Sequence, residues 1–133
     1  MELLNLDGEL KTAKDAATAA GKLLYENKKD LNKSIFSSDT DIKLKADIEA
    51  EDLIKSILAK ESSFPILAEE SGNPEGALLE ETFWVVDPLD GTANYTRDIP
   101  LCCVSIALMH MMEPVIGVIH DFNSSNLYEG SFD

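Results

Sequence analysis

Apolar residues recur every three or four positions along two stretches of the chain, and this spacing predicts two long helices. The first is expected over about residues 3–28, and the second begins at about Ile42 and includes Asp47. The charged residues on the second helix are expected to form mainly a solvated face. The two apolar stripes are Leu6, Leu10, Ala13, Ala17, Ala20 and Leu24, then Ala46, Ala50, Leu53, Ile54, Ile57 and Leu58.

The segment between the two predicted helices, residues 27–41, is rich in asparagine, lysine, serine and aspartate. This composition is typical of a loop. Residues 38–41, Ser-Asp-Thr-Asp, are candidates for the start of the second helix because their side chains can cap free backbone amides.

Short apolar and β-branched runs predict the strands. They cover residues 64–67, 83–86, 102–110, 113–121 and 126–132, and the third and fourth are expected to form a hairpin around Met111 and Met112. Consecutive strands joined by tight turns favour an antiparallel sheet, against which two helices can bury their stripes. The predicted fold class is α+β, with two long helices packed on a mainly antiparallel sheet.

The chain of 133 residues is long enough for one domain with a real core, and its formal net charge is -14. Such an acidic chain repels nucleic acid and anionic membrane surfaces but attracts cations. The sequence shows neither an apolar run long enough to span a membrane nor the basic start of a signal peptide. Cys102 and Cys103 are adjacent and poorly placed to bridge each other, so we expect reduced thiols and a cytoplasmic location.

Two carboxylates, Asp87 and Asp90, follow the predicted strand at residues 83–86, and Gly91 and Thr92 come directly after them. Two acids aimed into one pocket repel each other unless a proton or cation neutralises them, and Mg²⁺ prefers such oxygen ligands. The amides of Gly91 and Thr92 at the start of a helix would attract an anion. The alternative is an ordinary Asx-type turn, since Asp-Gly pairs are commonly used in that way.

The complete string Asp87-Pro88-Leu89-Asp90-Gly91-Thr92-Ala93-Asn94-Tyr95 resembles the signature of the inositol monophosphatase family, the lithium-sensitive, Mg²⁺-dependent phosphatases. The resemblance implies that Asp87, Asp90 and the Leu89 carbonyl bind metal, and that Gly91 and Thr92 bind phosphate. It also implies two or three Mg²⁺ ions, inhibition by Li⁺ and an αβαβα sandwich of which this chain is the N-terminal lobe.

Two further segments resemble motifs of the same family. Asp47 occupies the place of the aspartate in Thr-x-Ala-Asp, with Leu44 where the family has threonine, a change expected to weaken the helix cap. The resemblance makes Asp47 and Thr92 the catalytic pair that activates water. Ala68-Glu69-Glu70-Ser71 resembles Gly-Glu-Glu-Ser, which makes Glu69 a metal ligand.

Members of the resembled family are longer and contribute another aspartate from a Trp-Asp-x-Ala motif. Residues 1–133 are therefore expected to form the N-terminal metal-binding lobe, without the C-terminal lobe. The implied function is hydrolysis of a small phosphate monoester, foremost an inositol phosphate, by metal-activated water, and the isolated lobe is expected to have lost full turnover. A homodimer, or association with the missing half, is the expected assembly.

Other functions remain open at this level. Within the family, the substrate could be fructose 1,6-bisphosphate or a 3′(2′),5′-bisphosphate nucleotide, although Asn94-Tyr95 favours the inositol phosphatase branch. From a different class, the chain could be a non-catalytic metal-binding or assembly module that pairs through an exposed sheet edge. His110 and His120 are expected to be satisfied strand residues, because imidazole suits softer ions than Mg²⁺.

Overall fold

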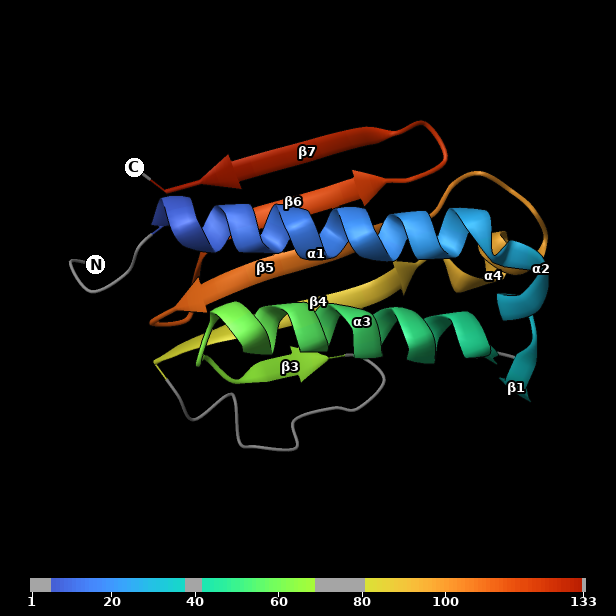
Figure 1. Ribbon diagram of the computed structural model, residues 1–133, viewed down its shortest axis with the longest axis horizontal. Coiled ribbons are helices and arrows are strands. Elements are labelled where there is room, and N and C mark those ends of the chain that lie inside the picture. The colour runs from blue at the N-terminus through green and yellow to red at the C-terminus, as the bar shows by residue number, and fades with distance from the viewer. Residues whose placement is uncertain (1–5, 38–41, 69–80, 133) are drawn as a thin grey trace.

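A computed structural model describes residues 6–37, 42–68 and 81–132 and shows a five-stranded sheet covered on one face by two long helices (Figure 1). The helices are α1 (Leu6–Glu26) and α3 (Lys45–Glu61). They lie side by side, α1 over β5 and β6 and α3 over β4. The predicted α+β architecture is therefore confirmed. Neither α1 nor any other helix among the described residues combines the length and hydrophobicity needed to cross a membrane.

The strand order in the sheet is β3-β4-β5-β6-β7, so sequence neighbours are also neighbours in space. Only β3 and β4 pair in parallel, and the other three pairings are antiparallel. The strands are β3 (Ile66–Ala68), β4 (Thr82–Asp90), β5 (Cys103–His110), β6 (Glu113–Asp121) and β7 (Asn126–Ser131). The predicted hairpin between β5 and β6 is present, and Met111 and Met112 adopt left-handed backbone conformations at its tip.

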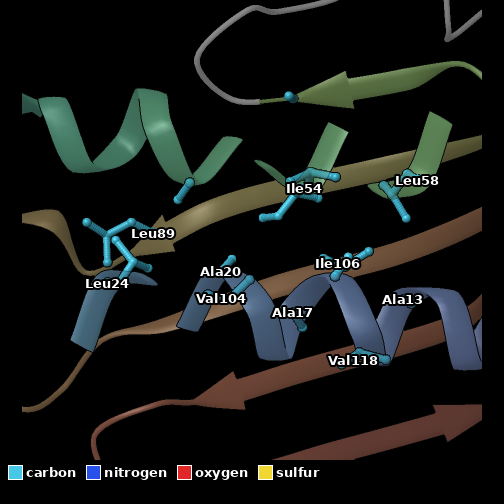
Figure 2. Packing of buried hydrophobic residues seen from close by; sticks show 14 of the residues in the cluster. Ala13, Ala17, Ala20, Leu24, Ile54, Leu58, Leu89, Val104, Ile106 and Val118 are labelled. Carbon is cyan, nitrogen blue, oxygen red and sulfur yellow. The ribbon is translucent and has the colours of Figure 1, made fainter. Parts of the chain in front are cut away.

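The core lies between the helix pair and the near face of the sheet (Figure 2). The predicted stripes supply it: Ala13, Ala17 and Ala20 on α1 are fully buried, as are Ile54 and Leu58 on α3. Because alanine side chains are small, α1 can pack closely against both its partner helix and the sheet at these positions. The facing residues from the sheet include Val86, Leu89, Val104, Ile106, Leu108, Ile116 and Val118.

Helix α1 packs tightly against the sheet at Gly21. A Cβ atom on Gly21 would lie 2.2 Å from Nδ1 of His120 on β6, so only glycine fits there without a shift of the ring. The same Nδ1 lies 2.9 Å from the carbonyl oxygen of Ala17. His110 is paired similarly, with Nδ1 2.8 Å from Oγ1 of Thr82. Both histidines are thus satisfied strand residues, as predicted.

The predicted loop over residues 27–41 is wrong in part. The structure forms α2 (Lys28–Leu31) and then β1 (Ser34–Ser37), which pairs antiparallel with β2 (Ile42–Leu44). Elements this short do not establish a hydrophobic period, and their formation depends on backbone pairing with a distant segment. Residues 38–41 lie outside the described residues, but α3 begins only at Lys45, so the predicted helix start is wrong as well.

The solvated face predicted for the second helix also needs one correction. Glu51 is 4% exposed, and its Oε2 lies 3.8 Å from Nζ of Lys55 one turn later. Asp47 is likewise buried. Helical periodicity shows which face is apolar, but it does not show which acids at the edge of that face are covered by neighbouring segments.

Candidate active site

The two acids of the signature lie at the C-terminal end of β4. The strand continues to Asp90, beyond the predicted end at Val86, and Asp87 pairs opposite Ser105 while Asp90 pairs opposite Cys103. One extra residue is therefore accommodated in β4 between the two acids, which makes a β-bulge. A bulge re-aims side chains next to it, and such bulges are frequent beside functional sites.

Gly91 turns the chain from β4 into the short helix α4 (Thr92–Thr96), with a φ of +97°. This left-handed conformation favours glycine, and a Cβ atom here would lie 2.7 Å from the carbonyl oxygen of Leu101. The same carbonyl accepts a hydrogen bond of 2.8 Å from Nδ2 of Asn94. Two constraints, one conformational and one steric, therefore require glycine between the acids and Thr92.

The predicted catalytic pair, Asp47 and Thr92, is brought together from positions 45 residues apart in the sequence. Oγ1 of Thr92 lies 3.0 Å from Oδ1 of Asp47 and 3.1 Å from the carbonyl oxygen of Leu89. Because the hydroxyl has one proton, these two oxygens share or alternate as its acceptors. The contact joins the first turn of α3 to the first residue of α4.

Asp47 is held from its other side by the backbone. Its Oδ2 accepts a 2.9 Å hydrogen bond from the amide of Leu44, the residue that precedes α3. This is the half of a capping box that the third helical residue provides. Leucine has no side-chain oxygen for the reciprocal half, so one of the two hydrogen bonds of a capping box is present and the acid is still anchored. The carboxylate is only 2% exposed.

Asp87 and Asp90 have more open surroundings. Asp87 is half-buried, with Oδ1 3.3 Å from the amide of Leu89, and Asp90 is exposed. Asp90 pairs opposite Cys103, whose pKa is raised to about 11 by burial first and then by the charges of Asp90 and Asp87. Cys102 and Cys103 are free thiols.

The donors at this end of β4 fit a hard divalent cation in their chemistry. Asp87, Asp90 and the Leu89 carbonyl offer oxygen only, and Mg²⁺ takes oxygen ligands. The described ranges contain no cluster of three or more acidic, histidine or cysteine side chains arranged to bind a metal. The third carboxylate expected from the sequence, Glu69, lies outside the described residues.

Tyr95 was noted in the sequence only as the aromatic residue of the signature, and its hydroxyl contact was missed. The side chain is 1% exposed, and its hydroxyl donates a 2.7 Å hydrogen bond to the carbonyl of Leu24 in the last turn of α1. Burial raises its pKa, with smaller contributions from Cys102 and Asp47. The hydroxyl of an aromatic residue expected to be buried was the available signal, since buried hydroxyls need partners.

Comparison with known proteins finds similarity over almost the whole chain, including the residues of the candidate site. The family model described as "Inositol monophosphatase family" matches residues 5–132. Inositol monophosphatase 1 from Solanum lycopersicum is 32% identical over 129 residues, covering 95% of this chain and 47% of the relative. Fructose-1,6-bisphosphatase/inositol-1-monophosphatase from Aquifex aeolicus is 35% identical over 132 residues, covering 96% of this chain and 48% of the relative.

The fold gives the same result. The structure of inositol monophosphatase from Anabaena superposes with a TM-score of 0.78 at 34% identity, covering 96% of this chain and 45% of that one. The chain thus spans about half the length of the relatives it matches. Both the family model and these similarities include the signature at the end of β4. The chain belongs to the inositol monophosphatase family.

Proposed function

We propose that this chain supplies the metal-binding and phosphate-binding lobe of a Mg²⁺-dependent phosphatase that hydrolyses a small phosphate monoester, with an inositol phosphate as the first candidate. The observation that carries the proposal is the contact between Thr92 and Asp47, at 3.0 Å, beside the two acids of β4. In this proposal residues 1–133 are the N-terminal lobe, and a second lobe completes substrate selection and turnover.

The proposed catalytic step is a proton relay. Thr92 directs its hydroxyl proton toward Asp47, which leaves the lone pairs of Oγ1 to accept a proton from an attacking water. As the water loses its proton to Oγ1, the threonine proton passes to Oδ1 of Asp47, so the proton finishes on the carboxylate. The Leu44 amide keeps the other oxygen of Asp47 in place during this transfer. Asp47 is thus the general base and Thr92 the intermediate group.

Metal binding and phosphate binding are the proposed roles of the segment where β4 ends and α4 begins. Asp87, Asp90 and the Leu89 carbonyl would hold Mg²⁺, with Glu69 as a further ligand, and the amides of Gly91 and Thr92 would bind the phosphate. When bound, Mg²⁺ supplies a lowered water pKa and charge neutralisation at the phosphate. The bulge in β4 supports these roles because it lies between the two acids, and a bulge re-aims the side chains next to it.

The test of the proposal is Mg²⁺ binding by isothermal titration calorimetry, comparing this chain with its Asp87→Asn variant. Asp87→Asn keeps the shape of the side chain and removes one carboxylate charge, so we expect at least a tenfold weaker association. Asp52→Asn is the matched control, since Asp52 lies exposed on α3 and carries the same charge. Unchanged Mg²⁺ binding in Asp87→Asn would refute the metal site.

The substrate is tested with a polypeptide extended to the length of the relatives. Phosphate release is compared for an inositol phosphate, fructose 1,6-bisphosphate and a 3′-phosphoadenosine nucleotide. We expect the highest kcat/KM with the inositol phosphate, and Asp47→Asn should lower kcat for whichever substrate reacts. A preference for either of the other two would keep the enzyme class and correct the substrate.

A second candidate function is a non-catalytic assembly module. The face of the sheet opposite the helices favours it: Ile119 alternates with the buried Val118, pairs with Tyr128 across the strands, and the two are 45% and 58% exposed. A contiguous exposed apolar patch commonly marks a surface that contacts another chain, and these two residues are cross-strand neighbours. Sedimentation with and without Mg²⁺, together with a phosphatase assay, separates the functions: an inactive oligomer supports the module, and an active species supports the enzyme.

A further inference from the structure

Helix α4, which begins with Thr92, has only five residues and receives no side-chain hydrogen bond at its start. Isolated helices of this length are unstable in water, because the cost of the first turn is not recovered. The position of α4 therefore depends on contacts with other elements. Since Thr92 is the residue that meets Asp47, whatever holds α4 also sets the geometry of this pair.

One such contact is deeply buried. The hydroxyl of Tyr95 reaches 71 positions back along the chain to the carbonyl of Leu24, at 2.7 Å. Leu24 lies in the last turn of α1, where carbonyl groups have no partner within the helix. The bond thus satisfies two groups that would otherwise be buried without a partner, which makes it costly to remove.

The ring of Tyr95 is fixed as well as its hydroxyl. It packs edge-to-face against Phe122, with ring centroids 6.3 Å apart. On its other contact, Nζ of Lys28 from α2 lies 5.1 Å from the centroid of the Tyr95 ring. Lys28 also forms an ion pair with Asp98, which follows α4. A substitution that keeps the ring but removes the hydroxyl should therefore leave the packing in place and test the hydrogen bond alone.

Thr92 and Tyr95 are three residues apart, so their side chains lie on the same side of the short helix. We propose that Tyr95 is a positioning residue: its hydroxyl, bound to the end of α1, sets the position of α4 and thereby holds Thr92 against Asp47. The consequence for catalysis rests on the proposed function. The positioning itself does not, and it can be measured in this chain without metal or substrate.

The experiment compares Tyr95→Phe with the unmodified chain by nuclear magnetic resonance. The reporter is the amide of Leu44, which donates its hydrogen bond to Asp47, whereas the Tyr95 hydroxyl donates to Leu24. We expect its chemical shift to move in Tyr95→Phe, and amide exchange at Tyr95 and Arg97 to rise about tenfold, the change that about 1.4 kcal/mol produces. Exchange at Val104 and Ile106 in β5 should stay the same.

Two further variants test whether the effect of Tyr95 reaches Asp47 through Thr92. Tyr25→Phe is the matched control, because Tyr25 is 60% exposed on α1, and it should change neither reporter. In a Thr92→Ala background, Tyr95→Phe should no longer move the Leu44 amide, since the connection through Thr92 is gone. A shift that persists in that background would overturn the proposal.

Other outcomes are also decisive. An unmoved Leu44 amide, or exchange that rises equally in α4 and β5, would show that the hydroxyl contributes only general stability and would overturn the positioning role. A Tyr95→Phe chain that does not fold would overturn it in the same way. Failure of Mg²⁺ binding or of phosphatase activity would refute the proposed function and leave these measurements unaffected.

Discussion

Asp47 and Asp90 lie in the same candidate site, yet one is enclosed and the other open. Asp47 is 2% exposed, and its two oxygens accept hydrogen bonds from the Leu44 amide and the Thr92 hydroxyl. Asp90 is exposed at the end of β4. The difference separates two uses of a carboxylate: an enclosed, hydrogen-bonded acid has a fixed orientation before any ligand arrives, whereas an open acid keeps its lone pairs for a ligand.

Among substitutions that test the difference between Asp47 and Asp90, Asp47→Ala is expected to lower the free energy of unfolding the most. The substitution leaves the buried Leu44 amide without its acceptor and leaves the Thr92 hydroxyl with the Leu89 carbonyl alone. We expect the free energy of unfolding to fall by about 3 kcal/mol, as for the loss of hydrogen bonds to a charged group. Urea denaturation measures it. The matched change on the solvated side of α3, Asp52→Ala, should stay within about 0.5 kcal/mol, and equal losses would contradict the distinction.

A smaller loss is expected at the residue that links the open acids to Thr92. Gly91→Ala forces a side chain into a left-handed conformation and against the Leu101 carbonyl, which should cost about 2 kcal/mol. Gly130→Ala is the control, because a Cβ atom on Gly130 meets nothing within 4 Å. Thermal unfolding of the two variants should therefore differ by several degrees. Similar melting temperatures would show that the turn adapts easily.

The reactivity of the Cys103 thiol depends on its burial and on the charges of the two more open acids, Asp90 and Asp87. Its pKa of about 11, against an ordinary value of 9.0, lowers the thiolate fraction near pH 8 by roughly a hundredfold, so alkylation should be slow. The folded state holds this proton more tightly than the unfolded state, so the contribution to stability is present below pH 9 and lost as pH rises through about 11. Cys103→Ser should lessen that alkaline loss. Fast alkylation in the folded chain would contradict the raised pKa.

The smallest effect on stability is expected from Asp90→Asn. Without metal, exchanging an exposed carboxylate for an amide should change the free energy of unfolding by less than about 0.5 kcal/mol. With Mg²⁺ at ten times its dissociation constant, the unmodified chain should gain about 1.4 kcal/mol and the variant much less. Denaturation curves with and without Mg²⁺ give both numbers. A large loss without metal would mean that Asp90 is as structural as Asp47.

Much of the fold could be predicted because its main elements are long and periodic. The stripe from Ala13 to Leu24 has a spacing that only a helix accommodates, and it is buried as predicted. The β5–β6 hairpin followed from two apolar runs around a short turn. The prediction failed for α2, β1 and β2, which have three or four residues each. Such elements owe their form to neighbours distant in sequence, which a local pattern does not contain.

The candidate site was predictable as residue types and less so as contacts. Asp47 and Thr92 were paired from the family resemblance, and the structure places them in hydrogen-bond contact. The bulge that lengthens β4 and the Tyr95 bond to Leu24 were not foreseen. Both depend on strand register and on the place where α1 ends, and a small shift in either would change them without altering the sequence motif.

The fit of His120 against Gly21 constrains how the two positions can change in evolution. With 2.2 Å between Nδ1 of His120 and the point where a Cβ would begin, any larger residue at position 21 requires the histidine ring to move. Homologues with alanine or serine in place of the glycine are expected to carry a smaller side chain in place of the histidine, or to have the first helix displaced outward. An alignment of many members should therefore show these two columns varying together.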